Sequence, residues 1–143
     1  MADLHSILTN GVVFKGDKVL VSRRSFQEQH MPGRWTIPGG KVDHPKGDAF
    51  HILEKTVTRE ILEETGGEIE DEVQMVTNNA YTLHDRHVVA IVFKCQYKSG
   101  TAKPLEDTID CKWVTIDEVK KMDFPPNVKE YILEASKISR PKS

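Results

Sequence analysis

Apolar residues recur with two different periods along this chain. Runs that alternate with polar residues or are continuously apolar, and that are rich in β-branched side chains, predict strands, whereas spacings of three and four predict helices. Two expected strands are separated only by Lys15-Gly16-Asp17, which predicts a β-hairpin. The expected strands cover residues 6–14, 18–23, 35–37, 68–81, 87–97 and 111–114.

Helical spacing is found over about 48–65, over 116–122 and after Pro125-Pro126. In the last of these helices the apolar residues on one side are Val128, Tyr131, Ile132 and Ala135. In the first of these helices Asp48 is the expected N-cap and Gly66 the C-terminal stop. The second opens with the capping-box spacing of Thr115 and Glu118. Strands interleaved with helices, in a chain without repeats, predict an α/β sandwich with a mixed sheet, formed by a single domain over residues 1–143.

Composition narrows the class of protein. The 143 residues are 38% hydrophobic and 29% charged, with a formal net charge of −2, so no basic surplus favours a nucleic-acid polymer as partner. The longest apolar run, 88–93, is too short to cross a membrane. Cys95 and Cys111 suggest no disulfide framework, and the amino terminus lacks the features of a signal peptide. We expect a cytoplasmic protein, either a monomer or a homodimer.

The strongest chemical signal is the segment 59–67, Arg-Glu-Ile-Leu-Glu-Glu-Thr-Gly-Gly. On a helical wheel Glu60, Glu63 and Glu64 fall within about 100° of one another. They overlap the edge of the apolar stripe, which is formed by Phe50, Leu53, Val57 and Ile61. Like charges held there repel and lose hydration, which costs several kcal/mol per ion unless something neutralises them. Mg²⁺ would do so, because it prefers oxygen ligands and accepts substrate phosphates. The alternative is a solvated acidic helix end.

These residues carry a resemblance to a known family. Gly39-Gly40, then Gly47-Asp48, then the segment 59–67 resemble the Nudix box of the Nudix hydrolases, and the preceding Trp-Thr-Ile-Pro-Gly-Gly-Lys-Val is similar to the usual lead-in. Eighteen residues separate Gly40 from Arg59, however, where the family pattern has thirteen. The first acid of the box therefore has no unique counterpart. Matching the Gly-acid pair selects Asp48, and counting back along the helix from Arg59 gives His51. Glu54 is nearer to Arg59 but points about 140° away from it. We expect the insertion to form an extra helical turn that begins near Asp48.

The resemblance implies a Nudix-like α/β/α sandwich and a pyrophosphohydrolase. Its reaction would be the Mg²⁺-dependent hydrolysis of a phosphoanhydride in a nucleoside diphosphate linked to another moiety X, such as a nucleoside triphosphate or ADP-ribose, with Mn²⁺ as a substitute. By resemblance the metal ligands are the carbonyl of Gly40 and the carboxylates of Glu60, Glu63 and Glu64. Arg59 would orient Glu63. The alternative is a catalytically inactive Nudix-fold module that binds a nucleotide or a protein.

The general base is less sharply defined. In the family it is a glutamate of the box or an acid in a later loop, here 103–110, where Glu106 is the first choice and Asp107 the second. His84 and His87 have no standard metal-site spacing, and we interpret them as turn or surface residues.

Four residues are candidates for contact with the small-molecule nucleotide substrate. Arg23 and Arg24 end a predicted strand and could reach phosphate, or could be solvated strand-end charges. Trp35 and Tyr81 could stack on a base or sugar, although aromatic residues at such positions often belong to the core. Neither the base nor X can be identified from these residues.

Overall fold

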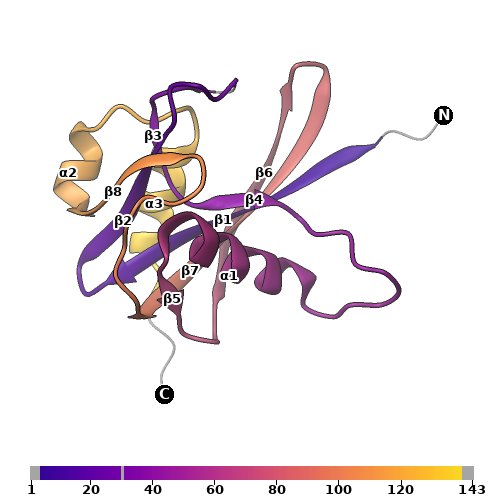
Figure 1. Ribbon diagram of the computed structural model, residues 1–143, viewed down its shortest axis with the longest axis horizontal. Helices are drawn as coiled ribbons and strands as arrows, with labels where there is room; N and C mark the ends of the chain where they lie inside the picture. Colours follow the sequence, from indigo (N-terminus) through magenta and orange to yellow (C-terminus); the bar gives the residue numbers. More distant parts are fainter. Residues whose placement is uncertain (1–3, 30, 140–143) are drawn as a thin grey trace.

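The structure is a computed structural model that describes residues 4–29 and 31–139. Within these residues the chain forms eight strands and three helices (Figure 1). The strands are β1 (His5–Lys15), β2 (Lys18–Arg24), β3 (Trp35–Thr36), β4 (Gly39–Lys41), β5 (Glu68–Ile69), β6 (Gln74–Leu83), β7 (Arg86–Ser99) and β8 (Thr108–Thr115). The helices are α1 (Ile52–Thr65), α2 (Ile116–Lys121) and α3 (Val128–Ser136).

The sheet is mixed, as the sequence predicted. β1 runs parallel to β7, in a register that extends from His5↔His87 to Phe14↔Gln96. β1 is also antiparallel to β2 and to β4, while β6 is antiparallel to β7. β2 pairs in turn with β3 and β8. The long parallel pair places β1 beside β7, the strand that contains the longest apolar run of the chain.

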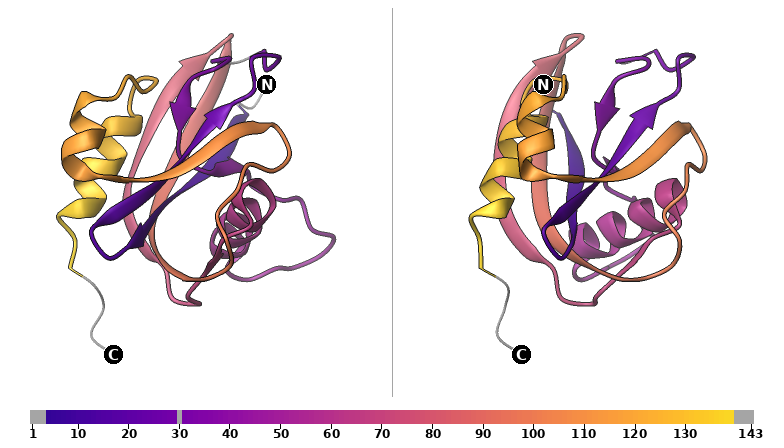
Figure 2. Two further views of the ribbon diagram at one scale, coloured as in Figure 1. Left: turned by 60° about the vertical axis from the view of Figure 1, so that its left-hand side comes forward. Right: turned by 90° about the vertical axis from the view of Figure 1, so that its left-hand side faces the viewer.

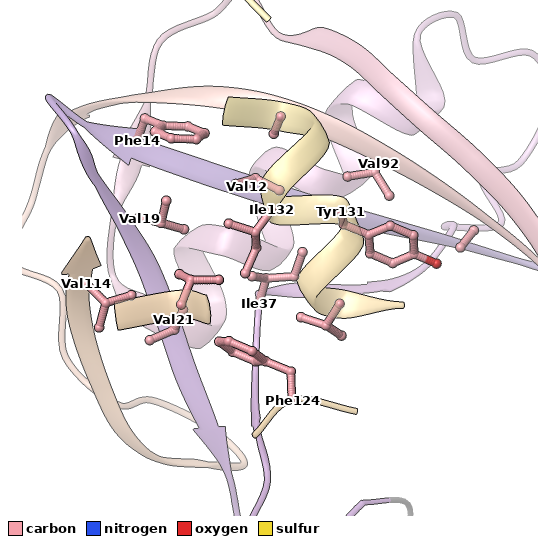
Figure 3. Close-up of a cluster of buried hydrophobic side chains, with 14 residues drawn as sticks. Val12, Phe14, Val19, Val21, Ile37, Val92, Val114, Phe124, Tyr131 and Ile132 are labelled. Atoms are coloured by element: carbon pink, nitrogen blue, oxygen red, sulfur yellow. The ribbon is translucent and has the colours of Figure 1, made fainter. Parts of the chain in front are cut away.

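Helices cover the sheet on two sides, which gives the α/β sandwich its layers. Figure 2 shows α1 on one side and α2 with α3 on the other. Successive side chains of β1 point to opposite faces of the sheet. Val12 and Phe14 belong to the core cluster that contains α3 (Figure 3), and Val13 belongs to the cluster beneath α1. Each fully buried side chain of this size stabilises the fold by about 1.5–3 kcal/mol. The predicted fold class is confirmed.

Several strands differ from the predicted ones. The region 68–81 contains two strands, β5 and β6, and β8 begins earlier than expected, at Thr108. The short strand β4 was not predicted, because a Gly-Gly-Lys segment has no apolar pattern. The capping box of α2 and the buried face of α3 were predicted correctly. No helix among residues 4–29 and 31–139 has the length and apolar character needed to cross a membrane.

The prediction that the main helix begins near Asp48 is wrong. α1 begins at Ile52, and its N-cap residue His51 has a left-handed backbone with φ 58° and makes no side-chain cap bond. Phe50, which the helical pattern placed on the apolar face, is 79% exposed. The chain is instead fixed earlier, where the backbone N–H of Asp43 donates to Thr56 Oγ1 at 3.3 Å. The inserted residues therefore form a loop between that contact and the start of α1.

Candidate active site

Strand β4 holds two glycines directly against the second half of α1. A Cβ atom added to Gly40 would lie 2.6 Å from the carboxyl carbon of Glu60, so a side chain there would displace that carboxylate. The backbone N–H of Gly39 donates to Glu64 Oε2 at 2.9 Å. β4 is itself held by β1, where Gly39 and Gly40 pair with Asn10 and Thr9. The sheet thus brings backbone atoms into contact with two of the three helix glutamates.

Burial changes the acid–base chemistry of these glutamates. It raises the pKa of Glu64 to about 8, against the lowering effects of the Gly39 hydrogen bond and the charge of Arg24. Burial also raises the pKa of Glu60, which the neighbouring Arg59 opposes. The negative charge of Glu106 acts in the same direction on both groups. The three carboxylates therefore share one electrostatic environment, and a cation placed among them would relieve their repulsion.

Arg59 binds three carboxylates at once. Its Nη1 donates to Glu63 Oε2 at 2.7 Å and its Nη2 to Glu60 Oε1 at 3.0 Å. Its Nη2 and Nε donate to the two oxygens of Asp43, at 2.5 and 3.2 Å. The hydrogen bond to Asp43 is the main reason why the pKa of Arg59 rises above its ordinary value, so the guanidinium remains charged.

A cleft of about 690 Å³ runs from the helix glutamates across the sheet to the β6–β7 hairpin and the segment before α3. Arg24 lies in its lining and forms an ion pair with Glu28 at 3.4 Å. The sequence-predicted site residues that line the cleft are Arg24, Gly40, Glu60, Glu64, Tyr81 and Glu106. The structure thus brings together most of the residues that the sequence singled out.

Four other candidate residues do not line the cleft. Arg59 and Glu63 bind each other beside it. Arg23 donates from Nε to the carbonyl of Gly33 at 2.9 Å and lies over the ring of Phe26, so it fastens the loop between β2 and β3. Trp35 packs against the core cluster on the α3 side. The contacts of Arg23 and Trp35 explain their positions without a bound substrate.

Comparison with known proteins decides the family. A family model described as NUDIX domain matches residues 7–134, which is most of the chain. The chain belongs to the Nudix family. The resemblance that the box and its lead-in indicated is therefore confirmed.

Individual relatives agree with this assignment. A MutT-like protein of Streptomyces ambofaciens is 33% identical over 119 residues, which are 82% of this chain and 69% of that protein. A protein of Mycobacterium tuberculosis named putative 8-oxo-dGTP diphosphatase 2 is 26% identical over 141 residues, covering 94% of this chain and 90% of its own length. The solved structure of a MutT protein from Methanosarcina mazei Go1 has the same fold, with a TM-score of 0.75, 24% identity and coverage of 94% and 95%. The chain is a Nudix pyrophosphohydrolase.

Within the Nudix box, the acid that binds the arginine is one that the sequence did not single out. Neither Asp48 nor Glu54 contacts Arg59, and His51 instead lies 3.8 Å from Glu54. Asp43 binds Arg59 from the loop before the helix. Counting positions along an assumed continuous helix could not find it. The only available signal was an acid just after the lead-in glycines, in a loop lengthened by the insertion.

The donor set of the box fits a hard divalent cation, because the carboxylate oxygens of Glu60 and Glu64 gather where β4 meets α1. Among residues 4–29 and 31–139, no three or more His, Cys, Asp or Glu side chains converge on one ion position. The contacts give the reason: Glu63 is turned to Arg59, and Glu64 to the N–H of Gly39. These side chains would have to rotate to share one ion.

Proposed function

We propose that the protein hydrolyses a phosphoanhydride bond in a nucleoside diphosphate linked to another moiety X, and that it requires Mg²⁺, for which Mn²⁺ can substitute. The observation that carries this proposal is that Glu60, Glu64 and Glu106 face one cleft together with Arg24. Acidic groups suited to a metal and a cationic group suited to a phosphate thus lie in the same cleft.

The residues of the box would hold the metal. Its ligands would be the carbonyl of Gly40 and the carboxylates of Glu60, Glu63 and Glu64. When bound, the ion neutralises phosphate oxygens and lowers the pKa of a bound water molecule. Arg59, itself held by Asp43, keeps Glu60 and Glu63 in position, since it donates to both.

Residues outside the Nudix box would accept the proton and bind the substrate. Glu106 is the proposed general base, because it lines the cleft and lies close enough to Glu60 and Glu64 to raise their pKa values. Arg24 would bind a phosphate oxygen of the substrate. Tyr81 also lines the cleft and offers an aromatic face for a base or sugar.

A substrate panel tests the proposal. It should contain nucleoside triphosphates, dGTP and its 8-oxo form among them because one relative is named for that activity, together with ADP-ribose, a nucleotide sugar and a dinucleoside polyphosphate. Product release would be measured with Mg²⁺, with Mn²⁺ and with EDTA. We expect at least one compound to be cleaved at an anhydride, and EDTA to stop the cleavage. Binding without any product would favour the inactive binding module, and cleavage that continues in EDTA would contradict the metal requirement.

A further inference from the structure

The cleft extends beyond the carboxylates to the tip of the β6–β7 hairpin. Ser6, His84 and Arg86 line it there, and we call these three residues the hairpin end. The same residues line a second hollow, together with His5 and His87 among others. His5 and His87 are register partners on β1 and β7, with ring centroids 5.6 Å apart. Three imidazoles and a guanidinium therefore gather at this end, together with the carboxylate of Asp85, which lines the second hollow.

The two ends of the cleft differ in charge. The acidic residues of its lining come from α1 and from the loops that follow β2 and precede β8; they are Glu28, Glu60, Glu64, Glu106 and Asp107. At the hairpin end, Arg86 donates from Nη1 to Ser6 Oγ at 3.5 Å. It forms no ion pair with any acid in the described part of the chain, although Asp85 is its neighbour in sequence. A guanidinium with unused N–H donors, facing a cleft, is suited to an oxyanion.

The hairpin end is too far from the glutamates to serve the same pair of phosphates. Glu64 is bonded to Gly39, the register partner of Asn10 on β1. Arg86 contacts Ser6, four residues earlier on that strand, which corresponds to about 13 Å along the strand. Figure 1 shows the hairpin and the first part of β1 projecting away from α1. Adjacent phosphates share a single bridging oxygen, so one diphosphate cannot reach both ends.

We propose that the hairpin end is a second anion subsite, in which Arg86, Ser6 and His84 bind a phosphate monoester carried by the substrate away from the bond that is cleaved. The position of that bond rests on the proposed function. The monoester can lie on the ribose of the nucleoside or on a sugar within X, because both present the same dianion. The substrate class is then a nucleoside diphosphate derivative with an additional phosphate.

Binding measurements in EDTA test this subsite without hydrolysis. The probes are ADP-ribose, ADP-ribose 2′-phosphate and ADP-ribose 1″-phosphate, which share one diphosphate and differ only in the additional group. We expect the wild-type protein to bind one phosphorylated probe at least about tenfold more tightly than ADP-ribose, which corresponds to about 1.4 kcal/mol. The preferred probe identifies which sugar carries the phosphate.

Two variants distinguish a specific subsite from non-specific attraction between opposite charges. Arg86→Gln should bind the three probes with equal affinity and leave the affinity for ADP-ribose within about twofold. Lys120→Gln removes the same charge from an exposed position on α2, outside the cleft lining, and should keep the wild-type preference. Equal wild-type affinity for all three probes, absence of binding included, would overturn the subsite, as would a preference retained by Arg86→Gln.

The same panel with Mg²⁺ tests the proposed function separately. A preference for a phosphorylated probe without cleavage of any anhydride would support the subsite and count against the proposed hydrolysis. Cleavage of an anhydride without a preference for a phosphorylated probe would support the proposed hydrolysis and overturn the subsite.

Discussion

Asp43 and Arg59 are joined at two points, Nη2 to Oδ1 at 2.5 Å and Nε to Oδ2 at 3.2 Å, across sixteen residues of sequence. Two-point pairing fixes the plane of the guanidinium as well as its position. From that position Arg59 also donates to Glu60 and Glu63. The loop before α1 therefore sets the orientation of two glutamates of the Nudix box.

Loss of the Asp43 carboxylate should impair catalysis through Arg59. We expect Asp43→Ala to lower kcat by about 10–100-fold, as the loss of a group that supports a metal ligand commonly does, and to raise the Mg²⁺ concentration needed for half-maximal rate. Asp43→Glu should recover part of the rate, because it restores a carboxylate. Both values come from initial rates measured over a range of Mg²⁺ concentrations.

Asp48→Ala is the matched control. Asp48 lies in the same loop before α1, caps no helix and is not among the partners of Arg59. Its loss should leave kcat within a few-fold of wild type and change the free energy of unfolding little. If Asp48→Ala were as damaging as Asp43→Ala, or if Asp43→Ala were harmless, the assignment of Asp43 would be wrong.

The buried carboxyl of Glu64 predicts how the stability of the metal-free protein depends on pH. Its folded-state pKa is about 8, against an ordinary value of 4.5, so the folded protein holds this proton more tightly than the unfolded chain. The resulting contribution to stability is present in full below about pH 4.5 and is lost as the pH rises toward 8. Chemical unfolding in EDTA at a series of pH values should show this decline.

Glu64→Gln and added Mg²⁺ test the origin of that decline. The amide does not titrate, so the variant should lose most of the slope between pH 4.5 and 8. Mg²⁺ should reduce the decline in the wild-type protein, since it binds the ionised carboxylate of the folded state. A slope of equal size in Glu64→Gln would show that another group is responsible.

A side chain at Gly40 should disturb the proposed metal site through Glu60. In Gly40→Ala the new Cβ meets the carboxylate of Glu60 at 2.6 Å, so Glu60 must move and Mg²⁺ affinity should fall by roughly tenfold or more. Isothermal titration with Mg²⁺ measures this. Gly47→Ala is the comparison: its φ is +74° with nothing within 4 Å, so it should reduce stability through backbone strain and leave Mg²⁺ affinity unchanged. Wild-type affinity in Gly40→Ala would contradict the assignment.

Glu106→Gln tests the proposed general base. We expect hydrolysis to speed up toward alkaline pH, because the attacking water must lose a proton. Replacing a base typically lowers kcat by about 10²–10⁴-fold, and this pH dependence should change with it. Gln is preferable to Ala, because it keeps the length of the side chain at a residue whose φ is +51°. Asp107→Asn, in the same loop, should keep the pH profile. A wild-type profile in Glu106→Gln would exclude Glu106 as the base.

Local sequence patterns predicted the elements whose formation depends on local chemistry. The capping box of Thr115 and Glu118 and the apolar face of α3 follow from spacing alone. The start of α1 does not follow from spacing, because residues 48–51 contain no helix breaker and are nevertheless not part of the helix. His51 is left-handed there, and the chain is held instead by the contact between Asp43 and Thr56. A contact between residues thirteen positions apart is invisible to a periodicity argument.

In the candidate site, too, local spacing predicted some features, and others depend on tertiary contacts. The helical wheel placed Glu60 and Glu64 together, and the structure places both in the cleft. The wheel could not show that Glu63 faces Arg59, or that Arg23 fastens a loop through the carbonyl of Gly33. The partner of Arg59 comes from a loop whose path depends on tertiary contacts. The sequence therefore identified the helix that carries the Nudix box and the family of the chain. It did not identify Asp43 as the residue that binds Arg59.

Hydrolysis as a function of Mg²⁺ concentration, in the wild-type protein and in Glu63→Gln, tests the central claim most directly. The substitution keeps the shape of the side chain and removes one charge of the proposed metal site. We predict that the wild-type protein is inactive in EDTA and regains its activity with Mg²⁺ or Mn²⁺, whereas folded Glu63→Gln stays slower by orders of magnitude at every Mg²⁺ concentration. Near-wild-type turnover in Glu63→Gln, or wild-type hydrolysis that EDTA does not affect, would contradict the account.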